Sequence, residues 1–360
     1  MDNKIKVLIV DDSLFMRNIL ERMIKGNDKM QVIGKAENGL QAIEMAKSLN
    51  PDVITLDIEM PKMDGLQALE RIMAESRTAV VMISSLTEAG ATATVKALEI
   101  GAVDFIPKAL DNSAENIFKK ASHVQNKIIT AAQSSVSSRR FRQPRKEETI
   151  QEKVVMPRMS SYLKRASFKV APKVLLIGSS TGGPKALGAI LSSLKADLKI
   201  PVVIAQHMPA GFTKALADRF DRDYDVNVKE VIDGDALKAG QVYIAQGGKH
   251  LRIEKSISGG LVAKVSSDNG ESPFKPSVDV LAESILKSVE GHCLCVMLTG
   301  MGSDGSKEFK KLHDKGAYVI TQSEDTCTVY GMPKSVDELK ASDEQLAIDD
   351  IAGVINSMVR

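Results

Sequence analysis

The sequence predicts an α/β protein with two doubly wound domains, each built on a parallel sheet, the second with some antiparallel strands. Three observations support this fold class. Short apolar runs alternate with amphipathic helical segments through most of the chain. A length of 360 residues exceeds that of one ordinary domain. A serine-rich and then basic stretch near the middle interrupts the pattern. We therefore expect domains at residues 1–125 and 173–360, joined by a flexible linker at 126–172.

The composition is that of an ordinary globular protein. Hydrophobic residues make up 43% of the chain and charged residues 26%. Three cysteines, an odd number, argue against a disulfide framework, and no Cys or His pair has the spacing of metal ligands. A strand-like run begins directly after Lys4, so we expect no signal peptide. No apolar run approaches the ~20 residues needed to cross a bilayer. We therefore expect a cytoplasmic protein that does not insert into a membrane.

Five short apolar runs predict the strands of the first domain. They are Val7–Val10, Gln31–Ala36, Val53–Leu56, Ala79–Ile83 and Val103–Ile106. Segments with helical periodicity separate them, such as Ser13–Lys25 with its apolar side chains on one face. Strands that alternate with helices predict a parallel sheet, and function in such sheets gathers where the strands end.

Charged residues follow three of these strands. Asp11 and Asp12 come after the first strand, Asp57 after the third and Lys108 after the fifth. Carboxylates that converge at one edge repel one another unless a cation lies between them, and Mg²⁺ prefers oxygen ligands. A helix N-cap before Ser13 could explain the first two alone. The combination favours a magnesium site.

Four segments around these residues resemble the motifs of bacterial response-regulator receiver domains. They are Val10–Ser13, Leu56–Pro61, Met82–Ser85 and Asp104–Lys108. The resemblance implies a flavodoxin-like fold in which Asp57 accepts a phosphoryl group from a histidine kinase. It also implies the remaining roles: Asp11 and Asp12, with Asp57, bind Mg²⁺; Lys108 pairs with the phosphoryl oxygens; and Ser84 bonds to them and moves with the aromatic switch residue Phe105.

One position departs from the receiver pattern. The family usually has a proline after the lysine, joined through a cis bond, whereas Ala109 follows Lys108 here. A cis bond before alanine would cost about 2.5–4 kcal/mol. We therefore expect the Lys108–Ala109 bond to be trans, or else visibly strained.

The linker region has a strongly positive local net charge of +8. Residues 139–173 contain eleven Lys and Arg against three Glu, although the net charge of the chain is only +2. Three prolines interrupt the stretch and no apolar period runs through it, so it cannot bury enough surface to fold alone. A basic segment could bind nucleic acid or anionic lipid. We favour a solvated tether.

The second domain begins with a strand, Lys173–Ile177, that enters the glycine-rich segment Gly178–Pro184. The segment has neither the dinucleotide fingerprint nor the Lys-Ser/Thr of a P-loop. It does satisfy the G-x-S-x-G pattern of a nucleophile elbow, which would expose the Ser180 hydroxyl and direct the Thr181 N–H at developing negative charge. A turn of small residues without chemistry is the alternative.

A nucleophilic serine needs a base and an acid that orients it. Among five histidines, His207 closes an apolar strand and so lies at the same sheet edge as Ser180. Asp304 lies in a glycine-rich loop after the strand Cys293–Leu298, and Asp279 is a competing acid at the start of a helix. The order Ser, His, Asp argues against the α/β-hydrolase fold, in which the acid precedes the histidine.

Six segments resemble the chemotaxis protein-glutamate methylesterase/glutamine deamidase family. They are Ile177–Pro184, Gln206–Phe212, Tyr243–His250, Pro276–Asp279, Leu298–Gly305 and Tyr330–Pro333. The resemblance covers both domains and implies a Rossmann-like catalytic domain behind the receiver. Long motifs in the right order make it specific.

This resemblance implies that Ser180 is the nucleophile, His207 the general base and Asp304 the residue that orients it. Backbone N–H groups of Met301 and Thr181 would bind the oxyanion. The substrates would be glutamate methyl esters, and some glutamines, on methyl-accepting chemoreceptors, and the phosphodonor would be the chemotaxis histidine kinase. It implies no cofactor in the catalytic domain, no nucleic-acid partner and a monomer.

Two alternatives stay open at this point. The second domain could be a non-catalytic binding module that uses the basic linker on nucleic acid, or the enzyme could be mainly a glutamine deamidase.

A receiver joined to a hydrolase could also cover the active-site mouth until Asp57 is phosphorylated. Coupling of this kind is commonly ~1–3 kcal/mol, or about 5- to 150-fold in activity.

Overall fold

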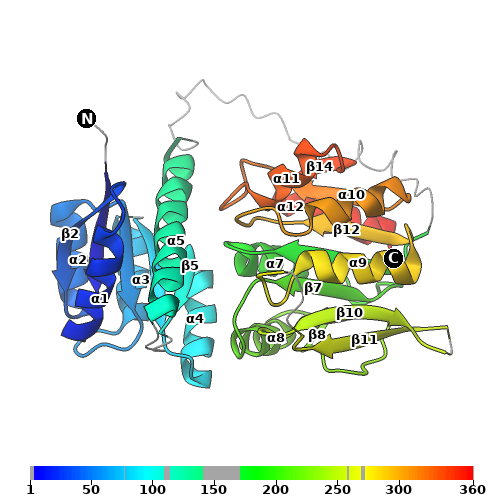
Figure 1. Cartoon of the computed structure of the whole chain (residues 1–360), viewed down its shortest axis with the longest axis horizontal. Coiled ribbons are helices and arrows are strands. Elements are labelled where there is room, and N and C mark those ends of the chain that lie inside the picture. Colours follow the sequence, from blue (N-terminus) through cyan, green and yellow to red (C-terminus); the bar gives the residue numbers. More distant parts are fainter. Residues whose placement is uncertain are drawn as a thin grey trace, which may run out of the picture. The chain divides into compact units, whose positions relative to one another are not determined.

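A computed structural model describes residues 4–76, 78–108, 114–140, 171–257, 259–268 and 272–359. The chain divides into two units, Met1–Arg140 and Phe141–Arg360, and each contains a parallel sheet covered by helices (Figure 1). The fold class predicted from the sequence is therefore confirmed. Residues 141–170, most of the predicted linker, and the Lys108–Ala109 bond lie outside the described residues.

The first unit is built on five parallel strands in the order β2-β1-β3-β4-β5, the order of a flavodoxin-like sheet. The strands are β1 (Ile5–Val10), β2 (Met30–Ala36), β3 (Val53–Asp57), β4 (Ala79–Ser84) and β5 (Asp104–Pro107). The helices are α1 (Leu14–Lys25), α2 (Gly39–Leu49), α3 (Gly65–Glu75), α4 (Glu88–Ile100) and α5 (Ala114–Arg140). Helices α1 and α5 pack together, and α3 packs between α2 and α4. All five predicted strands are present.

Helix α5 continues past residue 125, where the first domain was expected to end. Val124, Ile128, Ala131 and Ala132 are buried in the core of the first unit. Their spacing of four, three and one residues places them on one helical face. The serine- and glutamine-rich composition of this region led to its assignment to the linker at 126, although an apolar stripe runs through it. The first unit therefore extends to Arg140.

The second unit is built on seven parallel strands in the order β14-β13-β12-β6-β7-β9-β8, with a separate antiparallel hairpin of β10 and β11. The strands are β6 (Val174–Ser179), β7 (Val202–Gln206), β8 (Asn227–Glu230), β9 (Gln241–Ile244), β10 (His250–Lys255), β11 (Leu261–Ser266), β12 (Cys293–Met297), β13 (Tyr318–Gln322) and β14 (Glu344–Leu346). The helices are α7 (Gly183–Leu191), α8 (Phe212–Asp223), α9 (Val278–Val289), α10 (Ser306–Asp314), α11 (Met332–Glu338) and α12 (Ile348–Met358). The expected antiparallel strands are those of the hairpin.

The hairpin packs against α9 through two serine hydroxyls. Ser284 accepts the Ile253 N–H at 2.9 Å, and Ser288 donates to the Ile253 carbonyl at 2.6 Å. These bonds lie on the side of β10 that does not pair with β11. Helix α9 therefore covers the core and also provides hydrogen-bond partners for main-chain groups at the outer edge of β10.

Strand β6 lies between β7 and β12. The sheet is extended on one side of β6 by β7, β9 and β8, and on the other side by β12, β13 and β14, so the strand order changes direction at β6. Such a change of direction is where α/β sheets place their sites, beyond the carboxyl ends of the strands. All residues of these three strands are buried. No helix within the described ranges is both long enough and apolar enough to cross a bilayer.

Candidate functional site

Ser180 lies in a sharp turn between β6 and α7, as the sequence predicts. Gly182 has φ of +77°, and a Cβ atom there would lie 2.3 Å from the Thr328 hydroxyl. A Cβ atom on Gly183 would lie 2.0 Å from Gln206 Oε1. Only glycine fits both positions. Pro184 occupies the first turn of α7, where its missing N–H costs nothing.

Hydrogen bonds from two neighbouring strands hold this turn. The Ser180 N–H donates to the Thr299 carbonyl at 3.0 Å. The Gln206 amide donates to the Ser180 carbonyl at 3.0 Å and accepts from the buried Ser179 hydroxyl at 2.6 Å. The main chain at Ser180 is thus fixed on both sides before any substrate binds.

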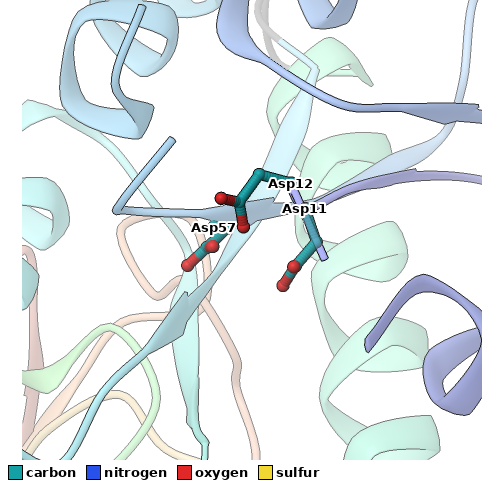
Figure 2. A group of neighbouring side chains, drawn as sticks. All are labelled: Asp11, Asp12 and Asp57. Atoms are coloured by element: carbon teal, nitrogen blue, oxygen red, sulfur yellow. The ribbon is translucent and has the colours of Figure 1, made fainter. Parts of the chain in front are cut away.

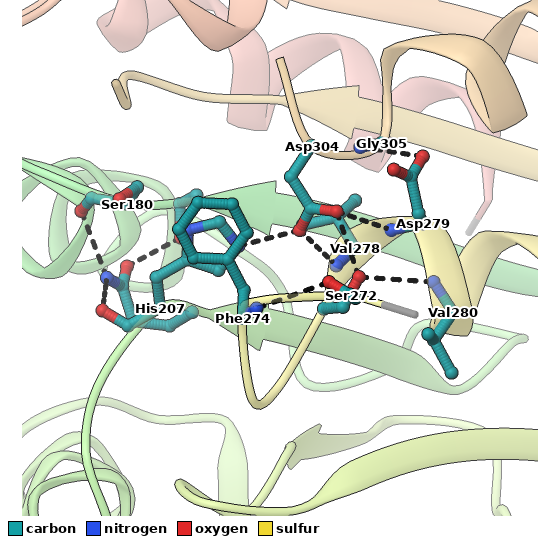
Figure 3. A network of polar contacts seen from close by, with 12 residues as sticks. Ser180, His207, Ser272, Phe274, Val278, Asp279, Val280, Asp304 and Gly305 are labelled. Atoms are coloured by element: carbon teal, nitrogen blue, oxygen red, sulfur yellow. Dashed lines mark hydrogen bonds and ion pairs between the residues drawn. The ribbon is translucent and has the colours of Figure 1, made fainter. Parts of the chain in front are cut away.

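His207 follows β7 directly and its main chain is bonded to the Ser180 turn, because its N–H donates to the Ser179 carbonyl at 3.0 Å. Its Nε2 atom lies 2.7 Å from Asp304 Oδ2. Figure 3 shows Ser180 on one side of His207 and Asp304 on the other. The Nδ1 atom is buried and has no hydrogen-bond partner among the described residues. The three predicted residues therefore lie together at one sheet edge.

Asp304 is buried at the N-terminus of α9, which surrounds it with donors. Its carboxylate accepts from the Ser277 hydroxyl at 2.9 Å, the Val278 N–H at 2.6 Å and the Asp279 N–H at 3.2 Å (Figure 3). Burial alone would raise the pKa of Asp304, but the hydrogen bonds from His207, Val278 and Ser277 outweigh it and lower the pKa. The carboxylate is therefore kept ionised by His207 first, and then by the donors at the N-terminus of α9.

Asp279, the competing acid, has another partner. Its Oδ1 atom accepts the Gly305 N–H at 2.9 Å and so ties α9 to the loop that carries Asp304. Burial, together with the charge of Asp304, raises the pKa of Asp279 to about 6. Its contact to the loop supports the position of Asp304.

The loop that contains Met301 lies against the Ser180 turn. A Cβ atom on Gly300 would lie 2.8 Å from Ser180 Cβ, so the two chains touch. The Gly300 carbonyl accepts the N–H groups of Gly331 and Met332 at 3.2 and 2.8 Å. Thr181, next to Ser180, accepts the Thr299 hydroxyl on its carbonyl at 3.0 Å. Thr181 therefore follows Ser180 in the chain, and Met301 follows the glycine that touches Ser180.

Three residues at this site were missed in the sequence. Phe274 stacks on the His207 ring with centroids 4.4 Å apart, Ser277 bonds to Asp304, and Gln206 holds the Ser180 turn. Ser277 could have been found, because a serine before an apolar helical pattern is typical of an N-cap. No local pattern indicates a ring stack.

The first unit places Asp11, Asp12 and Asp57 together at the ends of β1 and β3 (Figure 2). One carboxylate oxygen of each lies within 4.8 Å of the others. Lys108 Nζ lies 2.7 Å from Asp57 Oδ2 and 3.2 Å from Asp11 Oδ2. Burial, only partly offset by the bond from Lys108, raises the pKa of Asp57 to about 6. Burial would lower the pKa of Lys108, but the two carboxylates raise it.

The two predicted switch residues, Ser84 and Phe105, are both buried. The buried Ser84 hydroxyl donates to the Gly90 carbonyl at 3.1 Å and accepts from Thr94 at 2.6 Å, so it faces the start of α4. The Phe105 ring is buried, with Lys127 Nζ 5.3 Å from its centroid. The bonds to α4 hold Ser84 in this position.

The buried charge of Asp57 leads to a stability prediction. Its folded pKa of about 6 exceeds the ordinary value of 3.8, so the ionised carboxylate destabilises the folded receiver above pH 6. We expect Asp57→Asn to raise the free energy of unfolding by about 1–3 kcal/mol at pH 8 in buffer without divalent cations. The gain should disappear as the pH falls through 6 towards 4. Denaturant unfolding at several pH values measures it. The exposed Glu44→Gln serves as control, and an equal gain at pH 4 and 8 would contradict the prediction.

Two protein families match this chain, one in each of its two units. The family described as CheB methylesterase matches residues 175–355, and that described as response regulator receiver domain matches residues 7–121. A protein-glutamate methylesterase/protein-glutamine glutaminase 1 of Oleidesulfovibrio alaskensis is 42% identical over 99% of both chains. Another, numbered 2, of Nitratidesulfovibrio vulgaris is 42% identical over 98% of both.

A solved structure supports the assignment of the second unit. The CheB methylesterase catalytic domain of Thermotoga maritima has a TM-score of 0.51 and 38% sequence identity, and it covers 53% of this chain and 100% of its own. Matches to the family, to full-length relatives and to a solved catalytic domain thus coincide with the unit that holds Ser180, His207 and Asp304. The chain belongs to the CheB methylesterase family, with a response-regulator receiver domain ahead of its catalytic domain.

Proposed function

We propose that this chain is a phosphorylation-activated hydrolase that cleaves glutamate methyl esters, and deamidates glutamines, on methyl-accepting chemoreceptors. The observation that carries the proposal is the 2.7 Å pair of His207 and Asp304 beside the turn that holds Ser180. The full-length relatives carry names for both reactions. Because chemoreceptors are modified on their cytoplasmic helices in the family, the enzyme would act in the cytoplasm.

The contacts of His207 assign a role to each ring nitrogen. Since Nε2 is bonded to an ionised carboxylate, it carries the proton, and the lone pair is on Nδ1. Nδ1 would then take the proton of the Ser180 hydroxyl as Oγ attacks the ester or amide carbon. The same proton passes to the departing methanol or ammonia. Water then attacks the acyl-serine with His207 as the base and releases glutamate.

Negative charge on the carbonyl oxygen would be bound by the backbone N–H groups of Thr181 and Met301. Gly300 brings the Met301 loop against Ser180, and the hydrogen bonds that fix both loops support a preorganised site. Hydrogen-bond donors that need not move during the reaction stabilise the transition state more than water does, because water must first reorient. Each such donor typically contributes about 10²–10³-fold in kcat.

In the receiver, Asp57 would accept the phosphoryl group from the chemotaxis histidine kinase. The oxygen donors of Asp11, Asp12 and Asp57 fit Mg²⁺. Burial raises the pKa of Asp57 to about 6, and a cation beside its ionised carboxylate would stabilise that charge. When bound, Mg²⁺ supplies positive charge to the phosphoryl oxygens. Lys108 would pair with the same oxygens, and Ser84 would leave Gly90 to bond to them as Phe105 moves.

The test is hydrolysis of receptor that carries labelled methyl groups, with and without a small phosphodonor. Phosphorylation of Asp57 should raise methanol release by about 5- to 150-fold. The Asp57→Asn variant should keep the basal rate and show no response. No release of methanol in either condition would exclude a methylesterase, and ammonia release alone would favour the deamidase alternative.

A further inference from the structure

Phe274 lies against the imidazole of His207 in a stacked arrangement. Its ring plane is inclined by only 7° to that of His207, with the ring centroids 4.4 Å apart (Figure 3). Phe274 is 39% exposed, so it is not a core residue that happens to touch the histidine. The parallel contact of its ring with one imidazole face, and not its exposure, points to a role at that histidine.

The stack restricts rotation of the His207 ring. A half turn about the Cβ–Cγ bond would exchange Nδ1 with a carbon and break the 2.7 Å bond from Nε2 to Asp304. During such a turn an edge of the imidazole must leave its own plane and enter the space that the Phe274 ring fills. Nδ1 has no hydrogen-bond partner among the described residues, so Asp304 holds only one side of the ring.

The segment that carries Phe274 also donates hydrogen bonds to Asp304. Three residues further along, Ser277 donates its hydroxyl to Asp304 at 2.9 Å, and the next N–H, that of Val278, donates at 2.6 Å. A main-chain bond also holds the segment, because the Lys275 carbonyl accepts the Gly248 N–H at 3.0 Å. One short segment therefore contacts both members of the His207–Asp304 pair.

We propose that Phe274 is a positioning residue for the base: its ring keeps His207 Nδ1 directed at Ser180 and excludes water from one imidazole face. The proposal rests on the hydrolase function proposed above. It assigns Phe274 to the orientation of His207 and not to substrate binding, and this distinction can be measured.

The kinetic test compares two substitutions at this position. Phe274→Leu removes the stacked ring, and we expect kcat to fall about 10- to 100-fold because a slightly misdirected base loses the proton-transfer geometry. KM should stay within about threefold. Phe274→Tyr keeps the ring and should keep kcat within about threefold. The control is Leu339→Ala, at a comparably exposed apolar residue, which should leave both constants unchanged.

A second measurement needs no substrate. The proton on His207 Nε2, bonded to Asp304, should give a downfield resonance in the proton NMR spectrum of the full chain. We expect it to be sharp in the parent protein and in Phe274→Tyr, and broadened by exchange in Phe274→Leu. Circular dichroism melting would confirm that all variants are folded.

The outcomes separate this proposal from the hydrolase function. An unchanged kcat in Phe274→Leu, a raised KM with unchanged kcat, or an equally sharp resonance would each overturn the positioning role. If the parent protein released no methanol, the hydrolase function would fail, while the resonance would still report whether Phe274 orients the ring.

Discussion

Replacing Ser180 with alanine is expected to lower methanol release from methylated chemoreceptors by at least about 10⁴-fold. The substitution removes the atom that would form the acyl-enzyme, and the remaining groups can only bind and polarise the substrate. Release of labelled methanol under substrate excess measures the effect. Because the hydrogen bonds that hold Ser180 are made by its main chain, the free energy of unfolding should change by less than about 1 kcal/mol in a thermal melt.

The matched control is Ser192→Ala. Ser192 lies at the other end of α7 and is exposed, and its hydroxyl donates to the Ala189 carbonyl at 3.0 Å. It should keep the parent rate. If Ser180→Ala retained a tenth of the activity while Ser192→Ala was normal, Ser180 would not be the nucleophile, and the turn would be a structural feature.

The second large effect is expected from Asp304→Asn, which should lower kcat by about 10⁴-fold. An asparagine can present an N–H to His207 and so favour the tautomer in which Nδ1 carries the proton and cannot act as a base. Its single oxygen also cannot accept from all the donors that surround Asp304, namely His207, Ser277, Val278 and Asp279. Denaturant unfolding should therefore show a loss of about 1–3 kcal/mol.

Asp279→Asn is the informative comparison, since Asp279 is the other acid in this region. Its bond to the Gly305 N–H can be made equally well by an amide oxygen, so kcat should fall by less than about tenfold. Equal losses in the two variants would mean that Asp304 is not the distinct orienting residue. A larger loss for Asp279→Asn would reverse the assignment.

Much of this arrangement could be predicted from the sequence because the chemistry follows the ends of parallel strands. Ser180, His207 and Asp304 follow β6, β7 and β12, and the apolar runs alone place each of these loops at the carboxyl edge of a parallel sheet. The structure adds that the three strands are neighbours. The same reasoning brings Asp11 and Asp57 together in the receiver. Each of these predictions depends on short apolar runs that alternate with segments of helical period, which a sequence displays directly.

Other contacts depend on tertiary packing and could not be predicted in this way. Phe274 meets His207 across a loop, and its side chain carries no polar group that would single it out. The end of the first unit was misplaced because composition was weighed above the apolar stripe of α5. The bonds of Ser84 to α4 require the actual approach of a helix to a strand end.

The bonds from α9 to β10 have a consequence for how the protein behaves at high concentration. An outer strand with unused N–H and C=O groups is a template on which a second chain can form a ladder. At Ile253 both groups are taken by Ser284 and Ser288. At this residue two small hydroxyls thus occupy the main-chain groups that a second strand would need for pairing, a role that charged residues or proline have in other proteins.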